Sequence, residues 1–490
     1  MSTDPIDRRS TGIMARRWAL GCLAVALSLV AAGCSDAKME PGAGVIGEEP
    51  AVKRHITQAD IEAGEYTLEE LVAHGRDIFM ASFNTLDGAG RPEQHGKGGP
   101  RKRREMPDNF NRISAPDANA CMACHNLPAL GGGGDNAVNV FLVADSLPFV
   151  DFDGDPVENG PNQTLKTVGD ERNTVGMFGS GFIELLAREM TSDMHALRDA
   201  GCLAAADSGK PATVELVTKG VSFGSVTCLP DGSLDASAVE GVDEDLIVRP
   251  FHQKGAVVSL REFANNATIQ HHGMLSIEQA GEGEDPDVDG YVNELTRGDI
   301  TALVLFQATL PAPVQVEPET QAERDAVVYG RRLFDLIGCT QCHKPTLPLS
   351  SLEFVEPGPF NPDNDLGPDD VAVSYVVDLS PFITDLERDE EGNHLIPVFT
   401  DLKRHDMGDF LDNDAPLQNG IPTRLWLTRK LWGFFSEPPF LHHGRATLIS
   451  EAILAHGGEA QTQRDAFEEL SDYDKAALTE FLMTLRIDAG

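Results

Sequence analysis

Two short stretches of the 490-residue chain combine residue types and a spacing that suit redox chemistry. The first is Cys121-Met122-Ala123-Cys124-His125, and the second is Cys339-Thr340-Gln341-Cys342-His343. C-x-x-C-H is the attachment pattern of c-type haem, in which two thiols bond the porphyrin and the histidine becomes the proximal iron ligand. We therefore expect two covalently bound haem c groups. The expected cofactor-binding residues are Cys121, Cys124, His125, Cys339, Cys342 and His343.

A C-x-x-C pair can also be a redox dithiol or half of a zinc site. In this chain a histidine follows each pair directly, and this happens twice among only eight cysteines. The pattern favours haem attachment over both alternatives. His125 and His343 are then predicted iron ligands rather than core or surface histidines.

Length and charge limit the kinds of partner. A chain of 490 residues exceeds what one hydrophobic core usually supports, so two or three domains are expected. Acidic residues number 78 against 39 basic ones, which gives a formal charge of −39. This balance argues against nucleic acid or an anionic membrane surface as a partner. It suits a small, basic electron-donor protein, or solubility alone.

The N-terminus has the pattern of a targeting segment over residues 1–34. Four arginines precede the apolar run Trp18–Val30, which is too short to span a bilayer comfortably. The stretch Leu29–Cys34 resembles a bacterial lipobox, after whose cleavage Cys34 would be the lipidated first residue; simple secretion is the alternative. We expect a periplasmic or cell-envelope protein that contacts the membrane only through this lipid anchor. Residues 35–65 are predicted to be a flexible tether.

Export also permits disulfides, because the compartment outside the bacterial cytoplasm is oxidising. Cys22 would leave with the signal segment, Cys34 would carry the lipid, and four cysteines would bind haem. Only Cys202 and Cys228 are left over. They are predicted to form a disulfide that fixes the intervening loop, and the alternative is two buried, unpaired cysteines.

An internal repeat suggests how the haem motifs are positioned. A helical pattern that begins near Thr67 leads into Gly75-Arg76-Asp77-Ile78-Phe79, and a similar phrase, Gly330-Arg331-Arg332-Leu333-Phe334, precedes the second motif. Such a helix commonly opens a cytochrome c fold. We therefore predict a mainly α protein with two cytochrome-c-like haem domains and long irregular loops. Their expected bounds are 66–315, with insertions, and 316–490.

One carboxylate is a candidate for acid–base chemistry. Asn173–Leu186 changes from a Gly-rich stretch into an apolar helix, with Glu184 in its first turns. A carboxylate among apolar neighbours can have its pKa raised by desolvation and work as a general acid or base. The alternative is an ordinary glutamate on the solvent side of an amphipathic helix.

Two acidic stretches, Asp151–Asp155 and Asp285–Gly290, crowd carboxylates in a way that calcium can use. Neither is an EF-hand, because the twelfth position counted from Asp285 is Thr296 rather than a glutamate. For the second stretch, a calcium site and a plain acidic turn are the two interpretations.

Several motifs together carry a family resemblance. They are the two haem motifs, the repeated Gly-Arg phrase, Phe110-Asn111-Arg112, Glu294–Asp299, Pro439–Ile453 and Ala455–Glu459. With them the chain resembles the bacterial di-haem cytochrome c peroxidase superfamily, and more closely its di-haem oxidoreductase branch, once called thiol-oxidoreductase-like. The resemblance spans about residues 66 to 488.

The resemblance implies a sixth ligand for the second haem. In the superfamily this ligand follows the histidine of a Phe-His-Asp-Gly-like turn at a set spacing. Here the turn is Leu441-His442-His443-Gly444, and the spacing leads to His456. His456 is therefore the predicted metal ligand, which would make this haem bis-histidine. The superfamily generally has methionine there, and Met407 is the runner-up.

The resemblance also implies features that this chain lacks. The peroxidases use a tryptophan between their haems, but Trp18, Trp426 and Trp432 all lie outside the predicted first haem domain, so the electron route is expected to differ. The distal histidine of many resting peroxidases is also missing. The first haem is then either open or capped by His271 or His272. Glu184, on the stretch that matches the family's distal side, is the predicted catalytic acid.

These observations predict a peroxidase-like oxidoreductase. Hydrogen peroxide would react at the first haem with a proton moved by Glu184, and electrons would pass from a donor protein through the second haem. One alternative is a non-catalytic di-haem electron-transfer protein with both irons blocked. Another is a di-haem oxidase of a partner protein or an organic substrate.

Overall fold

The computed structural model describes residues 47–89, 118–140, 170–286, 290–412 and 420–488. The chain divides into two compact units, Met1–Glu48 and Glu49–Gly490. The predicted signal segment, the lipobox and Phe110-Asn111-Arg112 lie outside the described residues. Within the described ranges, no helix has both the length and the apolar character needed to span a membrane.

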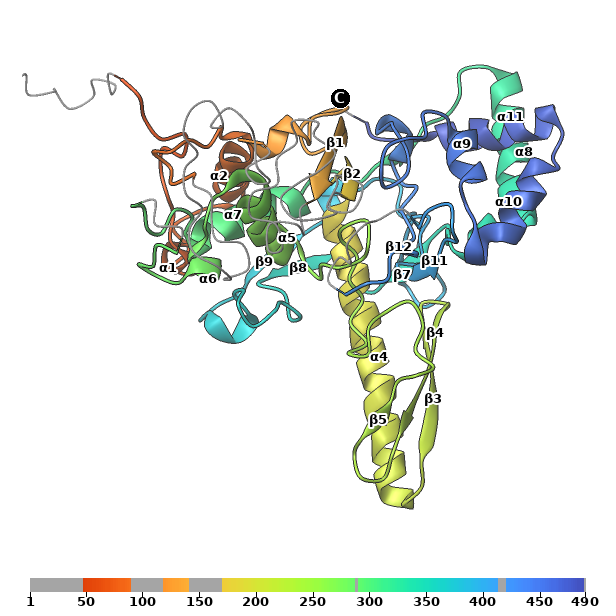
Figure 1. Cartoon of the computed structure of the whole chain (residues 1–490), viewed down its shortest axis with the longest axis horizontal. Coiled ribbons are helices and arrows are strands. Elements are labelled where there is room, and N and C mark those ends of the chain that lie inside the picture. The colour runs from red at the N-terminus through yellow and green to blue at the C-terminus, as the bar shows by residue number, and fades with distance from the viewer. Residues whose placement is uncertain (1–46, 90–117, 141–169, 287–289, 413–419, 489–490) are drawn as a thin grey trace, which may run out of the picture. The chain divides into compact units, whose positions relative to one another are not determined.

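A close helix crossing precedes the first haem motif. Helix α2 (Leu68–Met80) begins at Thr67 with a capping box and packs against α7 (Arg297–Ala308), as Figure 1 shows. Gly75 lies at the crossing, where a Cβ would come within 2.0 Å of the carbonyl oxygen of Ala302. Glycine is needed at this position because any side chain would collide with the neighbouring backbone.

A matching crossing precedes the second motif. Helix α8 (Gln321–Leu336) begins at Thr320 with a capping box and packs against α11 (Asp472–Met483). A Cβ on Gly330 would lie 1.9 Å from the carbonyl oxygen of Ala477. The repeated Gly-Arg phrase therefore marks, in both places, a helix that crosses its partner through a glycine.

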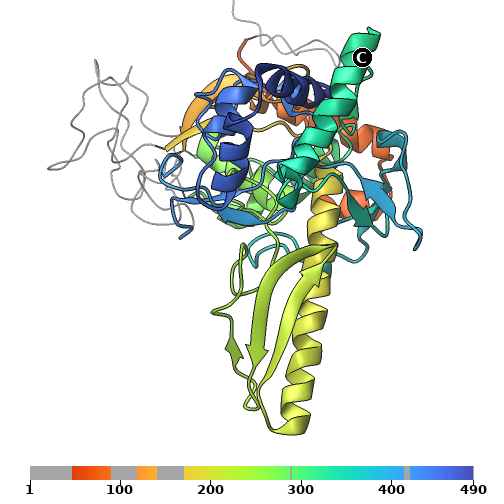
Figure 2. The same ribbon diagram turned by 90° about the vertical axis from the view of Figure 1, so that its right-hand side faces the viewer.

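A long helix and a small sheet extend together from the core. Helix α4 (Ser180–Ser208) has 29 residues, and its first turns are buried. Strands β3 (Ala212–Thr218) and β4 (Val221–Cys228) run beside its second half, and β5 (Leu234–Asp235) pairs with β4 (Figure 2). Phe223 and the other inward residues of this sheet are fully buried against the helix.

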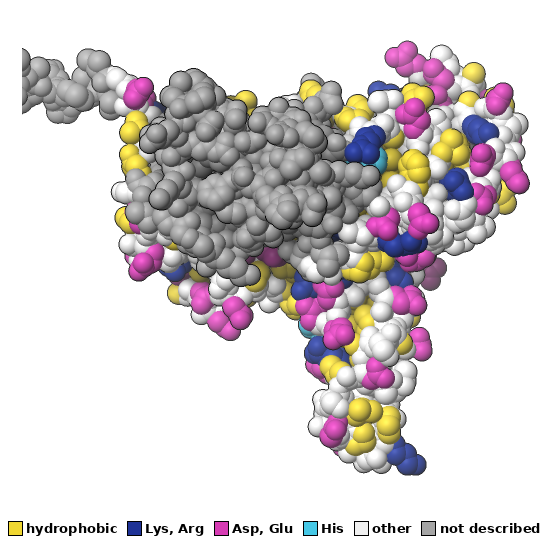
Figure 3. Space-filling view, viewed as in Figure 1, with side chains coloured by type: hydrophobic (Ala, Val, Ile, Leu, Met, Phe, Trp, Pro, Cys, Tyr) yellow, Lys and Arg dark blue, Asp and Glu magenta, His cyan; other side chains and the backbone are white. Residues whose placement is uncertain are grey.

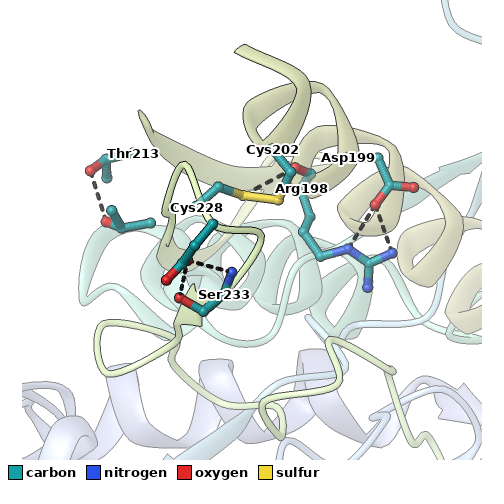
Figure 4. The surroundings of a disulfide bond; sticks show 8 residues. Arg198, Asp199, Cys202, Thr213, Cys228 and Ser233 are labelled. Carbon is teal, nitrogen blue, oxygen red and sulfur yellow. Dashed lines mark hydrogen bonds and ion pairs between the residues drawn. A yellow bond between two sulfur atoms is a disulfide. The ribbon is translucent and has the colours of Figure 1, made fainter. Parts of the chain in front are cut away.

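The predicted disulfide fastens this sheet to the helix. Cys202 on α4 and Cys228 at the end of β4 are joined, with an S–S distance of 2.09 Å (Figure 4). The hydroxyls of Thr213 and Thr227 lie 2.8 Å apart across the same pair of strands. The interpretation as two unpaired cysteines is therefore wrong.

The other strands form short antiparallel pairs. They are β1 (Gly134–Val140) with β2 (Asp170–Thr174), β6 (Val314–Gln315) with β13 (Leu485–Arg486), β7 (Leu347–Leu349) with β10 (His394–Ile396), β8 (Glu353–Glu356) with β9 (Tyr375–Asp378), and β11 (Arg404–Asp406) with β12 (Leu425–Leu427). The shorter helices are α1 (Gln58–Glu62), α5 (Leu260–Ala267), the π-helix η4 (Thr268–His272), α6 (Ile277–Ala280), α9 (Ile449–Leu454) and α10 (Gln461–Glu468).

The predicted fold class is wrong. Helix makes up 37% and strand 15% of the structure, with several small antiparallel sheets, so the protein is not mainly α with two cytochrome-c-like domains. The reason lies in the long Pro- and Gly-rich intervals, which pair as short strands instead of staying irregular. The predicted boundary at residue 315 stays a prediction, although the main hydrophobic core contains Leu305 and Phe354 from either side of it.

Candidate functional site: two histidine-lined cavities

The first haem motif borders a large, mostly apolar cavity. Cys121–Ala123 form one 3-10 turn, and the His125 N–H donates to the Cys121 carbonyl at 3.0 Å. Helices α2, α4, α5 and α7 contribute walls, through Phe79, Ile183 and Leu303 among others. Neither Cys121 nor Cys124 is in a disulfide.

The orientation of His125 suits a metal ligand. Its Nδ1 lies 3.1 Å from the carbonyl oxygen of Gly132, which can only accept, so Nδ1 carries the proton and Nε2 keeps a lone pair. The ring borders the cavity, yet desolvation by the surrounding protein lowers the pKa of His125 to about 4. Metals bind the neutral form of imidazole.

The second motif borders a similar cavity. His343 donates from Nδ1 to the carbonyl oxygen of Phe399 at 3.0 Å, and burial lowers the pKa of His343 to about 4. His456, at the end of α9, donates from Nδ1 to the Ala452 carbonyl oxygen at 2.8 Å. Burial lowers the pKa of His456 as well.

These two histidines lie opposite each other. Their ring centroids are 6.5 Å apart, and both Nδ1 atoms are engaged, so both Nε2 atoms are the free ligand atoms. A metal–imidazole bond is about 2 Å long, so the two rings can hold one metal atom between them. The residues of this cavity therefore fit a haem iron with two histidine ligands. Met407, the runner-up ligand, also lines the cavity.

The first cavity is built differently. Its other histidines are His252, His271 and His272. His272 is occupied at both ring nitrogens, with Nε2 3.3 Å from Cys121 Sγ and Nδ1 3.0 Å from the Ala118 carbonyl oxygen. It therefore packs beside an attachment cysteine and is poorly placed to cap the iron. His271 lines the cavity on the same π-helix, an element that often marks functional sites.

Sequence reasoning missed His252. This residue has a φ of 63°, an uncommon conformation for a residue other than glycine. Its ring meets Phe263 edge to face at 5.2 Å, and burial lowers the pKa of His252 to about 4. The only sequence signal was a histidine after Pro250-Phe251, which does not show that the chain turns back toward a cavity.

Glu184 does not line the first cavity, although Ile183 does. One of its carboxylate oxygens pairs with Arg188 at 2.5 Å, and the other accepts from the N–H of Leu260 at 2.8 Å. Burial raises the pKa of Glu184, and the charge of Arg188 opposes this effect. The glutamate is thus buried rather than solvent-facing and joins α4 to α5. Its role as the catalytic acid stays a prediction.

One layer of residues separates the two cavities. Asn173, Gln253, Leu427, Thr428 and Arg429 line both of them. Trp426 lies beside this layer and stacks on His442, with ring centroids 3.6 Å apart. The ammonium of Lys254 lies 3.8 Å from the centre of the same indole ring. A tryptophan is therefore present near the boundary, contributed by the second half of the chain.

Buried charges also gather at this boundary. Arg429 donates from Nη2 to Glu437 at 3.1 Å, and Lys430 donates to the carbonyl oxygen of Phe178 at 2.5 Å. Burial lowers the pKa of Lys430 to about 8. Burial raises the pKa of Glu437, against the effect of the two cations.

One group of described residues could hold a metal by its geometry, namely Cys342, Asp401 and His405. His405 bonds Asp401 at 2.8 Å and Glu459 at 2.7 Å. Burial would lower the pKa of His405, but the carboxylate of Asp401 and the nearby Cys342 raise it to about 11. Because Cys342 is a predicted attachment residue, this cluster belongs to the wall of the second cavity.

The calcium interpretation falls largely on residues that the structure does not describe. Asp151–Asp155 and residues 287–289 lie outside the described ranges. In the second stretch, the carboxylate of Asp285 accepts the N–H of Gly290 at 3.0 Å, as in an acidic turn. Calcium at this stretch stays a prediction.

The comparison with protein families agrees with this picture of the second cavity. No curated protein matches the chain. Residues 381–485, which include Met407, Trp426 and His456, match the family described as "Di-haem oxidoreductase, putative peroxidase". The family implies haem cofactors and an oxidoreductase activity. Over this segment the chain is similar to the di-haem oxidoreductases, which confirms the resemblance drawn from its motifs.

Proposed function

We propose that this protein is an exported di-haem c-type cytochrome that reduces hydrogen peroxide with electrons relayed between its two haems. The observation that carries the proposal is the difference between the two cavities. In the second cavity, His343 and His456 lie opposite each other with centroids 6.5 Å apart. In the first cavity, His125 meets Phe79 at 6.0 Å, a contact that His343 repeats with Phe334 at 6.3 Å. His271 lies close enough to His125 to lower its pKa. The second site would be closed by two histidines, and we propose that His271 leaves the first one open to peroxide.

The attachment residues would divide into two sets. Cys121 and Cys124 would bond the first haem, with His125 as its ligand. Cys339 and Cys342 would bond the second, with His343 and His456 as its ligands. Haem supplies one-electron and oxygen–oxygen bond chemistry when it is bound. The chain's contribution is to orient the histidines through Gly132, Phe399 and Ala452 and to surround the haems with apolar walls.

The shared wall supports an electron relay. Residues that line both cavities would leave the two haems separated by little more than one layer of side chains. Electrons entering at the second haem would cross this layer, near Trp426, to reach the first. With His343 and His456 both as ligands, the second site would not bind an oxidant and would serve to take up electrons and pass them on.

The proposed location and partners follow from other features. A disulfide between Cys202 and Cys228 supports an oxidising compartment, and we propose the periplasm or cell envelope, with a lipid on Cys34. Acidic side chains are scattered over the described part of the surface in Figure 3. This charge would attract a small, basic electron-donor protein.

Electron paramagnetic resonance of the oxidised protein tests the proposal. We expect one high-spin signal from the first haem and one low-spin bis-histidine signal from the second. The variant His456→Gly should lose the low-spin signal and keep the high-spin one, while Met407→Leu, in the same cavity, should keep both. The half-reduced protein should consume added peroxide.

Two low-spin signals in the oxidised protein, with no high-spin signal appearing after half-reduction, would contradict the peroxidase proposal. They would favour the electron-transfer alternative, in which both irons are blocked. A low-spin signal lost in Met407→Leu rather than in His456→Gly would reassign the sixth ligand.

A further inference from the structure

The peptide unit between Gly132 and Gly133 is hydrogen-bonded at both ends. Its carbonyl oxygen accepts from Nδ1 of His125 at 3.1 Å. Its N–H donates to Oε1 of Glu437, also at 3.1 Å. Glu437 lies 304 positions after Gly133 in the chain. One peptide group thus connects its carboxylate to His125, the predicted proximal ligand of the first haem.

The contact between Glu437 and this loop is tightly built. The Glu437 side chain is 2% exposed, and its Oε2 accepts from Arg429 at 3.1 Å. A Cβ on Gly133 would lie 3.0 Å from the Glu437 side chain, and one on Gly176 would lie 1.3 Å from its Oε1. The glycines at these two positions therefore leave the space that the carboxylate occupies.

Such an arrangement has a predictable electronic effect. A carboxylate at the N–H end of a peptide polarises it and makes its carbonyl oxygen a better acceptor, because linked hydrogen bonds strengthen one another. A stronger bond at Nδ1 makes Nε2 of the same imidazole more basic, as second-shell carboxylates do for metal-bound histidines. More electron donation from the ligand favours oxidised iron.

We propose that Glu437 is a positioning residue that tunes the first haem through the Gly132–Gly133 peptide and His125. The inference rests on the proposed attachment of haem at Cys121–His125. Glu437 lowers the reduction potential of that haem by strengthening the hydrogen bond at Nδ1. The corresponding bond of His343 ends on the carbonyl oxygen of Phe399.

The test uses the protein with both haems bound and two variants. Glu437→Gln keeps the shape and an acceptor but removes the charge, and Glu437→Asp keeps the charge but shortens the reach. Two readouts are needed: the reduction potential of the first haem, and its iron–histidine stretching frequency in the resonance Raman spectrum of the reduced protein. The stretch is specific to the first haem, because it is seen for five-coordinate iron.

We expect Glu437→Gln to raise the potential and to lower the stretching frequency. Glu437→Asp should also lower the frequency, with a smaller rise in potential. Glu459→Gln is the matched control, because Glu459 lines the second cavity and bonds His405 without contact to the Gly132–Gly133 peptide. It should leave the frequency unchanged.

A rise in potential with an unchanged frequency in Glu437→Gln would overturn the inference, since it would reflect only the loss of a nearby charge. Equal shifts of the stretching frequency in Glu437→Gln and in Glu459→Gln would also overturn the inference. If the wild-type protein lacks the stretch altogether, the open first site of the proposed function fails instead. The potential of Glu437→Asp then decides the inference, because this variant keeps the charge but shortens the reach: a rise supports the inference, and no rise overturns it.

Discussion

Three histidines that line the cavities each donate a hydrogen bond from Nδ1 to a backbone carbonyl oxygen. It is Gly132 for His125, Phe399 for His343 and Ala452 for His456. In each case the backbone decides which ring nitrogen is left for the metal. The C-x-x-C-H motifs predicted the first two histidines as iron ligands. Only the family spacing indicated His456, and nothing along the chain indicated Glu437 or His252.

Glu184 needs a test that separates its two possible roles. Glu184→Gln keeps the acceptor for Leu260 but leaves the partly buried Arg188 without its 2.5 Å partner. Breaking a buried pair commonly costs about 3–5 kcal/mol, so we expect a lower free energy of unfolding in urea titrations. We expect the folded fraction to keep its peroxide turnover, because Glu184 does not line the cavity.

The control for this variant is Asp199→Asn on the same helix, whose exposed side chain pairs with Arg198 and should lose much less stability. A severe loss of turnover in Glu184→Gln at unchanged stability would instead assign Glu184 the acid role expected from the sequence.

At the scale of elements, the glycine crossings explain why one phrase occurs twice. The α2–α7 and α8–α11 pairs each place a glycine against a neighbouring backbone carbonyl, and each leads directly toward a haem motif. The helical pattern that begins near Thr67 predicted α2, and the repeated phrase predicted a helix at Gly330–Phe334, which lies within α8. The short strands could not be predicted, because two- to four-residue pairs form where distant loops meet and carry no periodicity of their own.

Gly330→Ala tests the second crossing. The new Cβ would lie 1.9 Å from the Ala477 carbonyl oxygen, so α8 and α11 must move apart. Overpacking of this kind costs about 1–3 kcal/mol, which outweighs the gain of about 1 kcal/mol in helix propensity. We expect a lower midpoint in denaturant titration. Val328→Ala, at an exposed position of the same helix, should change the midpoint little, and equal effects of the two variants would contradict the close crossing.

The N-terminal segment of the second unit is attached to α7 by a buried carboxylate. Asp299 accepts from Nδ1 of His55 at 2.6 Å and from Nε2 of His74 at 2.8 Å. Burial would raise its pKa, but these bonds hold the pKa of Asp299 at about 2, below its ordinary value of 3.8. The bond to Asp299 raises the pKa of His55 above 6.5.

These shifts predict a pH dependence with two limbs. The lowered pKa of Asp299 in the folded state adds roughly 2 kcal/mol to the free energy of unfolding. This contribution is present above pH 3.8 and is lost as the pH falls toward 2. Because the folded pKa of His55 is raised, its contribution is present below pH 6.5 and is lost as the pH rises through the folded value. Asp299→Asn should flatten both limbs in urea titrations at several pH values. Unchanged limbs in this variant would show that other groups cause them.

At the scale of the whole molecule, the sequence indicated local features better than the architecture. The C-x-x-C-H motifs, the disulfide cysteines and the helices beside the motifs are local signals, and local signals can be seen along the chain. The fold class was wrong because β3–β4 and the strand pairs between Leu347 and Leu427 fill intervals that were expected to be irregular. The wall between the cavities joins residues from both halves of the chain, and such contacts leave no mark on spacing.

That common wall has a consequence for any redox titration of the protein. Two charge-storing groups that adjoin the same layer of side chains feel each other's charge, so the gain of an electron at one changes the affinity of the other for the next. The two apparent midpoints then belong to the coupled pair, as do the two apparent pKa values of interacting acids. An assignment of one midpoint to one haem needs a signal that only that haem produces.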